Sequence, residues 1–332
     1  MPAMRATEPA VTAGLRPISL LSIVVPMYNE QEVLAELHVR LSTAVAPLST
    51  RVEIVYVNDG SVDGTLERVR DLKRQDPRVA IVDLSRNFGK EVALAAGLDH
   101  AQGDAVVILD ADLQDPPELI PKFLEIYGQG YDVVYGQRRA RAGETWLKRA
   151  TAFTFYRVIQ RLTRVRIPAD TGDFRLLSRR AVDSLKKLRE QHRFTKGLFA
   201  WVGFRQKAVP YDRLPRFAGR TKWNYWRLWN FALEGITSFS TAPLKVASYM
   251  GLATAVGALL YAAWIIYKTL AFGEPVRGYP SLMVVILFLG GVQLTTIGIL
   301  GEYLGRVFDE TKGRPLYFVK EYEPAALPDE TR

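Results

Sequence analysis

The chain has no cysteine and only three histidines among its 332 residues. Without cysteine it has no disulfide framework, no thiolate zinc site and no cysteine nucleophile. The histidines, His38, His100 and His192, are too scattered along the sequence for a histidine-rich metal site. A G-x-G-x-x-G loop and a Walker A loop are also absent. Dinucleotide-binding and P-loop interpretations therefore lose their main support.

What the chain has in excess is positive charge, with 44 basic against 35 acidic residues and a net charge of +9. Nucleic acid, an anionic membrane face and phosphorylated substrates would all suit this balance. The basic residues gather near the apolar segments of the C-terminal half, so no nucleic-acid partner is expected. Residues 1–18 are rich in Ala, Pro and Thr and are expected to form a flexible tail, neither a signal peptide nor a membrane anchor.

Two long apolar runs, Val246 to Tyr267 and Gly278 to Gly301, contain no charged residue. Each exceeds the roughly 20 residues that a helix needs to cross a bilayer core. The alternative, buried helices of a soluble domain, is less favoured because the two runs are neighbours. The short link Lys268–Arg277 between them predicts an antiparallel helical hairpin in a membrane.

Flanking charge predicts the orientation of this hairpin. The connecting loop carries only Lys268 and Arg277, and the other side carries more basic residues: Arg227, Lys245, Arg306, Lys312, Arg314 and Lys320. The positive-inside rule then places both termini and the large N-terminal domain in the cytoplasm.

The N-terminal part alternates short apolar runs with helical stretches such as Glu32–Ala46 and Gly64–Arg74. The strand-like runs are Leu21–Val25, Glu53–Val57, Val79–Leu84, Ala105–Leu109 and Tyr131–Tyr135. This alternation predicts a doubly wound, mostly parallel α/β sheet.

Asp110-Ala111-Asp112 follows the fourth of these runs, at the strand end where open α/β sheets bind ligands. With one residue between them, the two carboxylates can converge on Mg²⁺ or Mn²⁺, and Gln114 adds a neutral oxygen at the same spacing. Such an ion would neutralise a diphosphate. The alternative is an acidic turn after a strand.

Polar residues also follow the other strands, in Pro26-Met27-Tyr28-Asn29-Glu30, Asn58-Asp59-Gly60-Ser61 and Ser85-Arg86-Asn87-Phe88-Gly89-Lys90. Any one of these loops alone is compatible with ordinary turn or capping chemistry. Their shared position favours a site in which Asp59 and Glu30 accept hydrogen bonds from a base or ribose. Arg86 and Lys90 would meet phosphate or sugar oxygens, and the alternative for Lys90, which its sequence context favours, is a solvated charge.

Together these motifs and Asp110-Ala111-Asp112-Leu113-Gln114-Asp115-Pro116-Pro117 resemble the inverting family 2 glycosyltransferases. More narrowly, they resemble the polyprenyl-phosphate glycosyltransferases, which include dolichol-phosphate mannose synthases and bacterial GtrB-type enzymes. Three later segments add to the likeness, which covers about residues 20 to 320: 171–176, 196–201 and 216–223.

The resemblance implies a GT-A (Rossmann-like) catalytic domain and a C-terminal transmembrane hairpin. The mixed aromatic and basic composition of 144–166 predicts an interfacial amphipathic helix, with a core helix that has a solvated basic face as the alternative, and the aromatic cluster before the first span predicts a second interfacial helix. The expected divisions are a tail at 1–18, the GT-A domain at 19–220 with an interfacial helix at 144–166, a juxtamembrane aromatic helix at 221–243, two transmembrane helices at 244–305 and a cytoplasmic tail at 306–332. It also implies a homotetramer in the bacterial inner membrane.

The resemblance also implies roles for single residues. Those expected to bind the nucleotide sugar are Pro26, Tyr28, Glu30, Asp59, Arg86, Lys90 and Asp110. Those expected to hold the metal, Mg²⁺ or Mn²⁺, are Asp110, Asp112 and Gln114. Arg175, Arg216 and Lys222 are expected to bind the acceptor phosphate or the diphosphate, and Asp173, Arg175 and Asp112 to be catalytic. Whether Asp173 orients the acceptor or accepts a proton is left open.

The expected reaction is inverting transfer of one hexose, with glucose from UDP-glucose favoured, to undecaprenyl phosphate. The chain has no Gln-x-x-Arg-Trp segment of the kind found in processive relatives, which favours transfer of a single sugar. The alternatives are another donor, such as GDP-mannose, and a non-catalytic membrane scaffold or flippase subunit.

Overall fold

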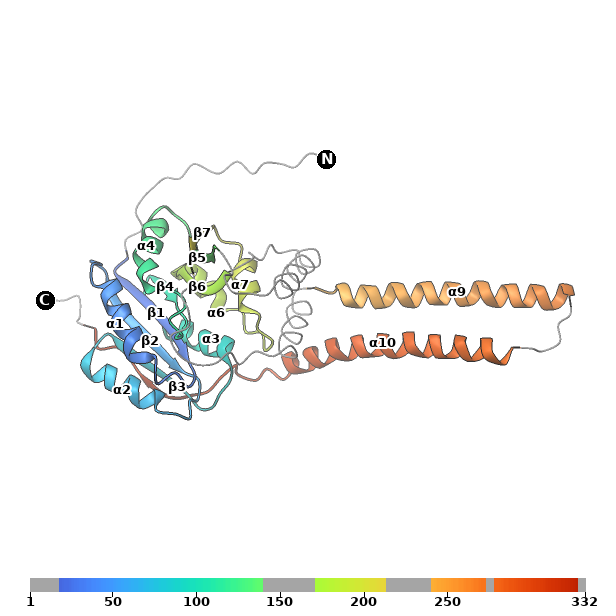
Figure 1. Cartoon of the computed structure of the whole chain (residues 1–332), viewed down its shortest axis with the longest axis horizontal. Coiled ribbons are helices and arrows are strands. Elements are labelled where there is room, and N and C mark those ends of the chain that lie inside the picture. Colours follow the sequence, from blue (N-terminus) through green and yellow to red (C-terminus); the bar gives the residue numbers. More distant parts are fainter. Residues whose placement is uncertain (1–17, 140–170, 213–239, 273–277, 328–332) are drawn as a thin grey trace. The chain divides into compact units, whose positions relative to one another are not determined.

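The computed structural model of the chain describes residues 18–139, 171–212, 240–272 and 278–327 (Figure 1). These residues fall into two compact units, a sheet-bearing unit that includes the C-terminal residues from 315 onward and a helical hairpin. The expected interfacial helix at 144–166 and most of the expected juxtamembrane helix at 221–243 lie outside the described residues.

Eight strands of the described residues form one sheet, in the order β7-β5-β6-β4-β1-β2-β3-β8. Their bounds are β1 Leu20–Met27, β2 Arg51–Asn58, β3 Val79–Leu84, β4 Ala105–Ile108, β5 Val133–Arg138, β6 Thr171–Ser178, β7 Gln206–Tyr211 and β8 Val319–Glu323. Strands β1 to β4 are parallel to one another, whereas β6 runs antiparallel to β4 and β5, and β8 antiparallel to β3.

Helices cover both faces of this sheet. Their bounds are α1 Leu34–Val45, α2 Thr65–Gln75, α3 Lys90–His100, the short 3₁₀ helix η1 Pro117–Leu119, α4 Ile120–Gly128, α6 Arg179–Lys186 and α7 Thr195–Trp201. Helices α1 and α4 share one apolar cluster with Leu21, Ile23 and Val25 of β1. Helix α3 packs on the opposite face, where a Cβ atom at Gly97 would lie only 2.3 Å from Val24. This close packing fixes α3, and therefore its first turn at Lys90, against the sheet.

The predicted doubly wound α/β sheet is confirmed, and its five predicted strands correspond to β1 to β5. Sequence reasoning did not identify β6, β7 or β8. The tail expected at 306–332 is only partly a tail, because Val319–Glu323 pairs with β3 at the sheet edge. Ion pairs from Arg70 of α2 to Glu321 and Glu323 support this pairing.

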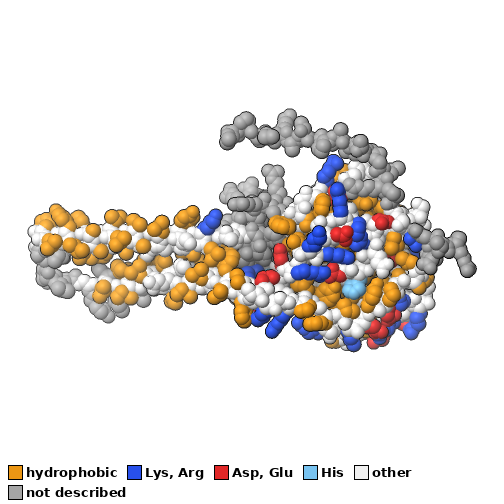
Figure 2. Space-filling model, turned by 180° about the vertical axis from the view of Figure 1, so that it is seen from behind, with side chains coloured by type: hydrophobic (Ala, Val, Ile, Leu, Met, Phe, Trp, Pro, Cys, Tyr) orange, Lys and Arg blue, Asp and Glu red, His pale blue; other side chains and the backbone are white. Residues whose placement is uncertain are grey.

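The second unit consists of α9 Ala242–Phe272 and α10 Tyr279–Thr311, on which the two predicted apolar spans fall. Both helices are long and apolar enough to cross a membrane. Hydrophobic side chains cover most of their visible surface, whereas charged side chains gather on the sheet-bearing unit (Figure 2). The Tyr303 hydroxyl donates to the Ser240 carbonyl at 2.6 Å, which joins the two ends of the hairpin.

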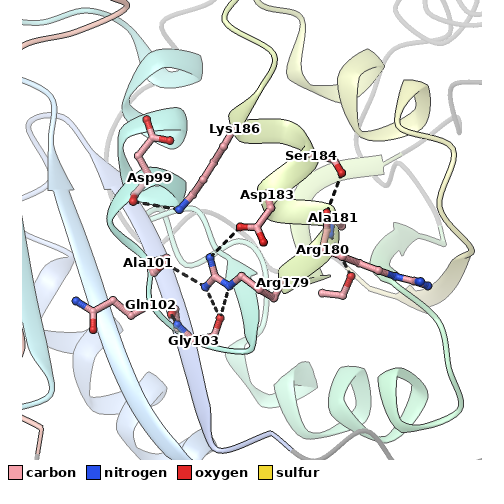
Figure 3. A network of polar contacts seen from close by, with 12 residues as sticks. Asp99, Ala101, Gln102, Gly103, Arg179, Arg180, Ala181, Asp183, Ser184 and Lys186 are labelled. Carbon is pink, nitrogen blue, oxygen red and sulfur yellow. Dashed lines mark hydrogen bonds and ion pairs between the residues drawn. The ribbon is translucent and has the colours of Figure 1, made fainter.

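Arg179, at the start of α6, ties the end of β6 to the loop that precedes β4 (Figure 3). Its guanidinium donates to the carbonyls of Gly103, at 2.9 Å from Nε, and of Ala101, at 3.1 Å. Lys186, at the other end of α6, donates to the Asp99 carbonyl at 3.1 Å. These bonds hold β6 in register beside β4, which matters because one carboxylate of the site described below lies on β6 and another just after the end of β4.

We expect Arg179→Ala to destabilise the sheet-bearing unit by about 2 kcal/mol, because hydrogen bonds from a charged donor contribute roughly 1.5–3 kcal/mol. Thermal unfolding of the purified protein should show a loss of several degrees. The matched control is Arg74→Ala, whose side chain is 75% exposed and paired with Asp71 of its own helix. That change should alter stability by less than about 0.5 kcal/mol. Equal stability of the two variants would contradict the anchoring role of Arg179.

Candidate active site

The predicted polar loops meet at the carboxyl edge of the parallel strands. Residues Met27 and Asn58 are register partners at the ends of β1 and β2. Just beyond them, the Asn29 backbone N–H donates to the Ser61 hydroxyl at 3.0 Å, and the Asn29 side chain accepts from the Val62 N–H at 2.9 Å. The first two loops are therefore joined by reciprocal hydrogen bonds.

Asp59 joins the second loop to the third. Its carboxylate accepts from the backbone N–H groups of Phe88, at 2.7 Å, and Gly89, at 2.9 Å. Burial raises the pKa of Asp59, and these two N–H groups and the charge of Arg86 offset part of that rise. Each carboxylate oxygen has a second lone pair, so hydrogen bonding to the protein leaves Asp59 able to accept from a ligand.

The remaining predicted nucleotide-binding residues line the same edge. Pro26 is buried near the end of β1, and Tyr28 just after it is 37% exposed. The Glu30 backbone N–H donates to the Thr65 hydroxyl at 2.9 Å, at the start of α2. The Arg86 guanidinium lies 4.0 Å from the centre of the Phe88 ring, a cation–π contact that orients it.

Asp173 lies on β6, and Asp110 follows the end of the neighbouring antiparallel strand β4. Ile108, the last residue of β4, pairs with Arg175 of β6, so the same register continued two residues beyond β4 brings Asp110 opposite Asp173. The Lys90 ammonium bridges them, donating to Asp110 Oδ2 at 2.8 Å and to Asp173 Oδ2. Three predicted site residues from three different elements are thus brought together.

The charges of this cluster shift one another's ionisation. Burial raises the pKa of Asp110, with the charge of Lys90 opposing and that of Asp173 adding to the rise. For Asp173, burial is outweighed by Lys90 and Lys196, which hold its pKa below the usual range. Although burial opposes it, the two carboxylates hold the pKa of Lys90 well above 10.5. Asp173 is therefore a carboxylate and Lys90 an ammonium ion at neutral pH.

Arg175 is buried beside this cluster. Its guanidinium donates to the carbonyls of Gly172, at 2.8 Å, and Asp173, at 3.3 Å, and lies 3.7 Å from the centre of the Phe199 ring. Burial lowers the pKa of Arg175 to about 10, so it still carries its charge at neutral pH. The charged guanidinium of Arg175 is therefore buried next to the backbone of Asp173.

The residues predicted to hold a metal fit a divalent ion that shares its coordination with a diphosphate. Asp112 accepts from the Gln114 backbone N–H at 3.2 Å, and Leu113 between them has a φ of 57°. Among the described residues, no three Asp, Glu or His side chains cluster as a complete metal site. Mg²⁺ commonly takes only one or two carboxylates, with substrate phosphates and water completing its shell. The Asp110 carboxylate already contacts a cation, the ammonium of Lys90, and Asp173 Oδ1 is buried without a hydrogen bond in the described part of the chain.

Sequence reasoning missed two acids beside the predicted residues, Asp115, which is buried, and Glu91, which is partly buried. Asp115, three residues after Asp112, accepts a hydrogen bond from the Tyr211 hydroxyl, and its carboxylate lies 3.9 Å from the Arg138 guanidinium. Glu91 has its pKa raised by burial and by the charge of Asp173. Asp115 belongs to a motif that the sequence analysis quotes, so its position was a usable signal. Nothing in the helical pattern around Glu91 distinguishes it from a solvated acid.

Two residues predicted to bind phosphate, Arg216 and Lys222, lie outside the described residues. Their roles stay predictions.

Comparison with known proteins covers both units. Residues 22–186 match glycosyl transferase family 2, and residues 242–307 match the GtrB C-terminal hairpin. An uncharacterized glycosyltransferase of Synechocystis is 57% identical over 91% of this chain and 95% of its own length. The SfII prophage-derived bactoprenol glucosyl transferase of Shigella flexneri is 50% identical over 91% of this chain and 97% of its own.

Among solved structures, a mannosyltransferase from Pyrobaculum calidifontis in complex with GDP-Man and Mn²⁺ is 18% identical, with a TM-score of 0.44, over 88% of this chain and 90% of that one. The mixed sheet and the family match agree with the expected GT-A fold. The chain therefore belongs to glycosyl transferase family 2, among the GtrB-like glycosyltransferases that carry a C-terminal hairpin.

Proposed function

We propose that the chain transfers one glucose from UDP-glucose to undecaprenyl phosphate at the cytoplasmic face of the membrane, with inversion at the anomeric carbon. The observation that carries this proposal is the likeness to bactoprenol glucosyl transferases, which spans the sheet-bearing unit and the apolar hairpin alike. One part of such an enzyme must bind a soluble nucleotide sugar, and the other must meet a lipid.

The nucleotide would bind across the first three loops. Asp59 retains acceptor capacity for base N–H groups, and Tyr28 offers an exposed aromatic ring at the same edge. Glu30 would accept from ribose hydroxyls, and Arg86 would contribute positive charge toward the phosphates. This arrangement supports a nucleoside diphosphate sugar as the donor. The donor assay described below identifies which base it carries.

Asp110, Asp112 and Gln114 would hold Mg²⁺ or Mn²⁺ on the diphosphate. When bound, such an ion stabilises the charge of the departing nucleoside diphosphate. The protein's own part is to orient the two carboxylates, through the β4–β6 register for Asp110 and the turn at Leu113 for Asp112. The described geometry supports an oxygen-ligand site of this kind.

The acceptor would be a phosphate monoester, whose second pKa is about 6, so its oxygen is already anionic near neutral pH. It therefore needs cations and orientation more than it needs a strong base. Arg175 lies buried behind Asp173 and stays charged at neutral pH. Arg216 and Lys222 would add charge around the incoming phosphate. Asp173, whose pKa is depressed, is better suited to orienting the acceptor than to removing a proton.

The proposal is tested with purified full-length protein, undecaprenyl phosphate, Mg²⁺ or Mn²⁺ and a panel of radiolabelled nucleotide sugars, scored for lipid-linked product. We expect UDP-glucose to be the best donor and each lipid to receive one sugar. Turnover with GDP-mannose but with no UDP-sugar would overturn the donor assignment. No product with any donor would favour a scaffold role instead.

Asp112→Ala should lower transfer by at least about a hundredfold, because a bound metal ion supplies several kcal/mol to the leaving group. It should also weaken metal-dependent UDP binding, which calorimetry measures directly. The matched control, Asp71→Ala, removes an exposed carboxylate of α2 that pairs with Arg74 of the same helix. Normal activity in Asp112→Ala would overturn the metal assignment.

Asp173→Asn should slow transfer by about a hundredfold, the usual cost of misplacing a reacting group by about 1 Å, and leave UDP affinity unchanged. Because the pKa of Asp173 lies below its usual range, the wild-type residue is already ionised throughout pH 5–9. The fall in transfer rate at acidic pH should therefore reflect protonation of the acceptor phosphate. The same fall should be seen with Asp173→Asn. Loss of that fall in Asp173→Asn would instead identify Asp173 as the titrating base.

A further inference from the structure

Lys90 contacts two carboxylates, one just after the end of β4 and one on β6. Its ammonium lies 2.7 Å from Asp110 Oδ1 and also donates to Asp173, and the side chains of these acids are 20% and 9% exposed. The Lys90 side chain is itself 47% exposed. Lys90 therefore remains partly open to solvent while its ammonium contacts both acids.

The bridging position is the one that a divalent ion on Asp110 would compete for. Opposed carboxylates in a partly buried site repel each other unless a cation lies between or beside them. A lysine carries one positive charge on a flexible stem. If the ammonium and a divalent ion both contacted Asp110, the two cations would repel each other, so sharing this carboxylate has an electrostatic cost. The most favourable arrangement therefore has one cation at Asp110, either the ammonium or the metal ion.

We propose that Lys90 is an exchangeable counter-ion for the Asp110–Asp173 pair, an inference that rests on the metal site of the proposed function. Without donor, the ammonium balances both carboxylates and weakens metal binding at Asp110. When the divalent ion arrives with a nucleoside diphosphate, Lys90 leaves Asp110 and turns to the diphosphate oxygens. The partial exposure of the Lys90 side chain allows this movement without repacking the core.

The exchange couples metal binding to nucleotide binding. When the metal ion binds alone, it competes with the Lys90 ammonium for the Asp110 carboxylate. When it binds together with a diphosphate, the diphosphate gives the ammonium a new anionic partner. Each ligand then strengthens the binding of the other by the same factor. Lys90 is thus a positioning residue whose removal should change this coupling factor.

Two variants separate the charge of Lys90 from its role in packing. Lys90→Gln removes the charge, and Lys90→Arg keeps it, while Gln and Arg resemble Lys in helix propensity at the first position of α3. Mn²⁺ binding to full-length protein is measured by electron paramagnetic resonance, with and without UDP. No acceptor or turnover is needed, and thermal unfolding checks that each variant is folded.

Without UDP, we expect Lys90→Gln to bind Mn²⁺ at least about tenfold more tightly than the wild type, a factor that corresponds to about 1.4 kcal/mol. The gain in Mn²⁺ affinity on adding UDP should be correspondingly smaller. Lys90→Arg should behave like the wild type in both measurements. Unchanged or weaker Mn²⁺ binding in a folded Lys90→Gln protein would overturn the exchange.

Asp112→Asn distinguishes failure of this inference from failure of the metal site itself. If Asp112→Asn loses Mn²⁺ binding and Lys90→Gln does not gain it, only the counter-ion role is wrong. If Asp112→Asn binds Mn²⁺ as the wild type does, the ion does not occupy the proposed site. The metal assignment and the counter-ion role of Lys90 are then both overturned.

Discussion

The structure depends on one electrostatic constraint, the placement of Asp110, just after β4, opposite Asp173 on the adjacent strand β6. Two carboxylates in a partly buried site need compensating charge, and the chain provides it through Lys90, with Arg175 buried behind Asp173. A reaction between a lipid phosphate and a nucleoside diphosphate sugar poses the same problem, because one anion must approach another. The fold concentrates ionisable groups of both signs where that approach would take place.

The surrounding packing maintains this arrangement. The Val24–Gly97 contact sets α3 against the sheet and so fixes the helix turn that carries Lys90. On the other side, Arg179 holds the end of β6 to the loop before β4, which preserves the register between the two acids. The site is therefore a property of three elements in fixed relation, α3, β4 and β6. No single motif contains it.

Much of the fold and part of the site followed from the sequence. The apolar runs predicted β1 to β5, and the rule that parallel strands end at one edge brought together the loops of Asp59 and Asp110. The sequence could not predict that β6 inserts beside β4 in the opposite direction, because such pairing depends on contacts between residues far apart in the chain. The bridge from Lys90 to Asp173 was hidden for that reason. Likewise, residues 319–323 are mostly charged and mostly exposed, so nothing in their pattern indicated an edge strand.

The most direct test of this account is a structure of the full-length protein with Mn²⁺ and UDP, in which anomalous scattering locates the metal. The account predicts a Mn²⁺ peak within coordination distance of the Asp110 and Asp112 carboxylates and the diphosphate, with the Lys90 ammonium withdrawn from Asp110. A metal bound elsewhere, or a Lys90 ammonium still bridging Asp110 and Asp173 beside a bound metal and diphosphate, would contradict it.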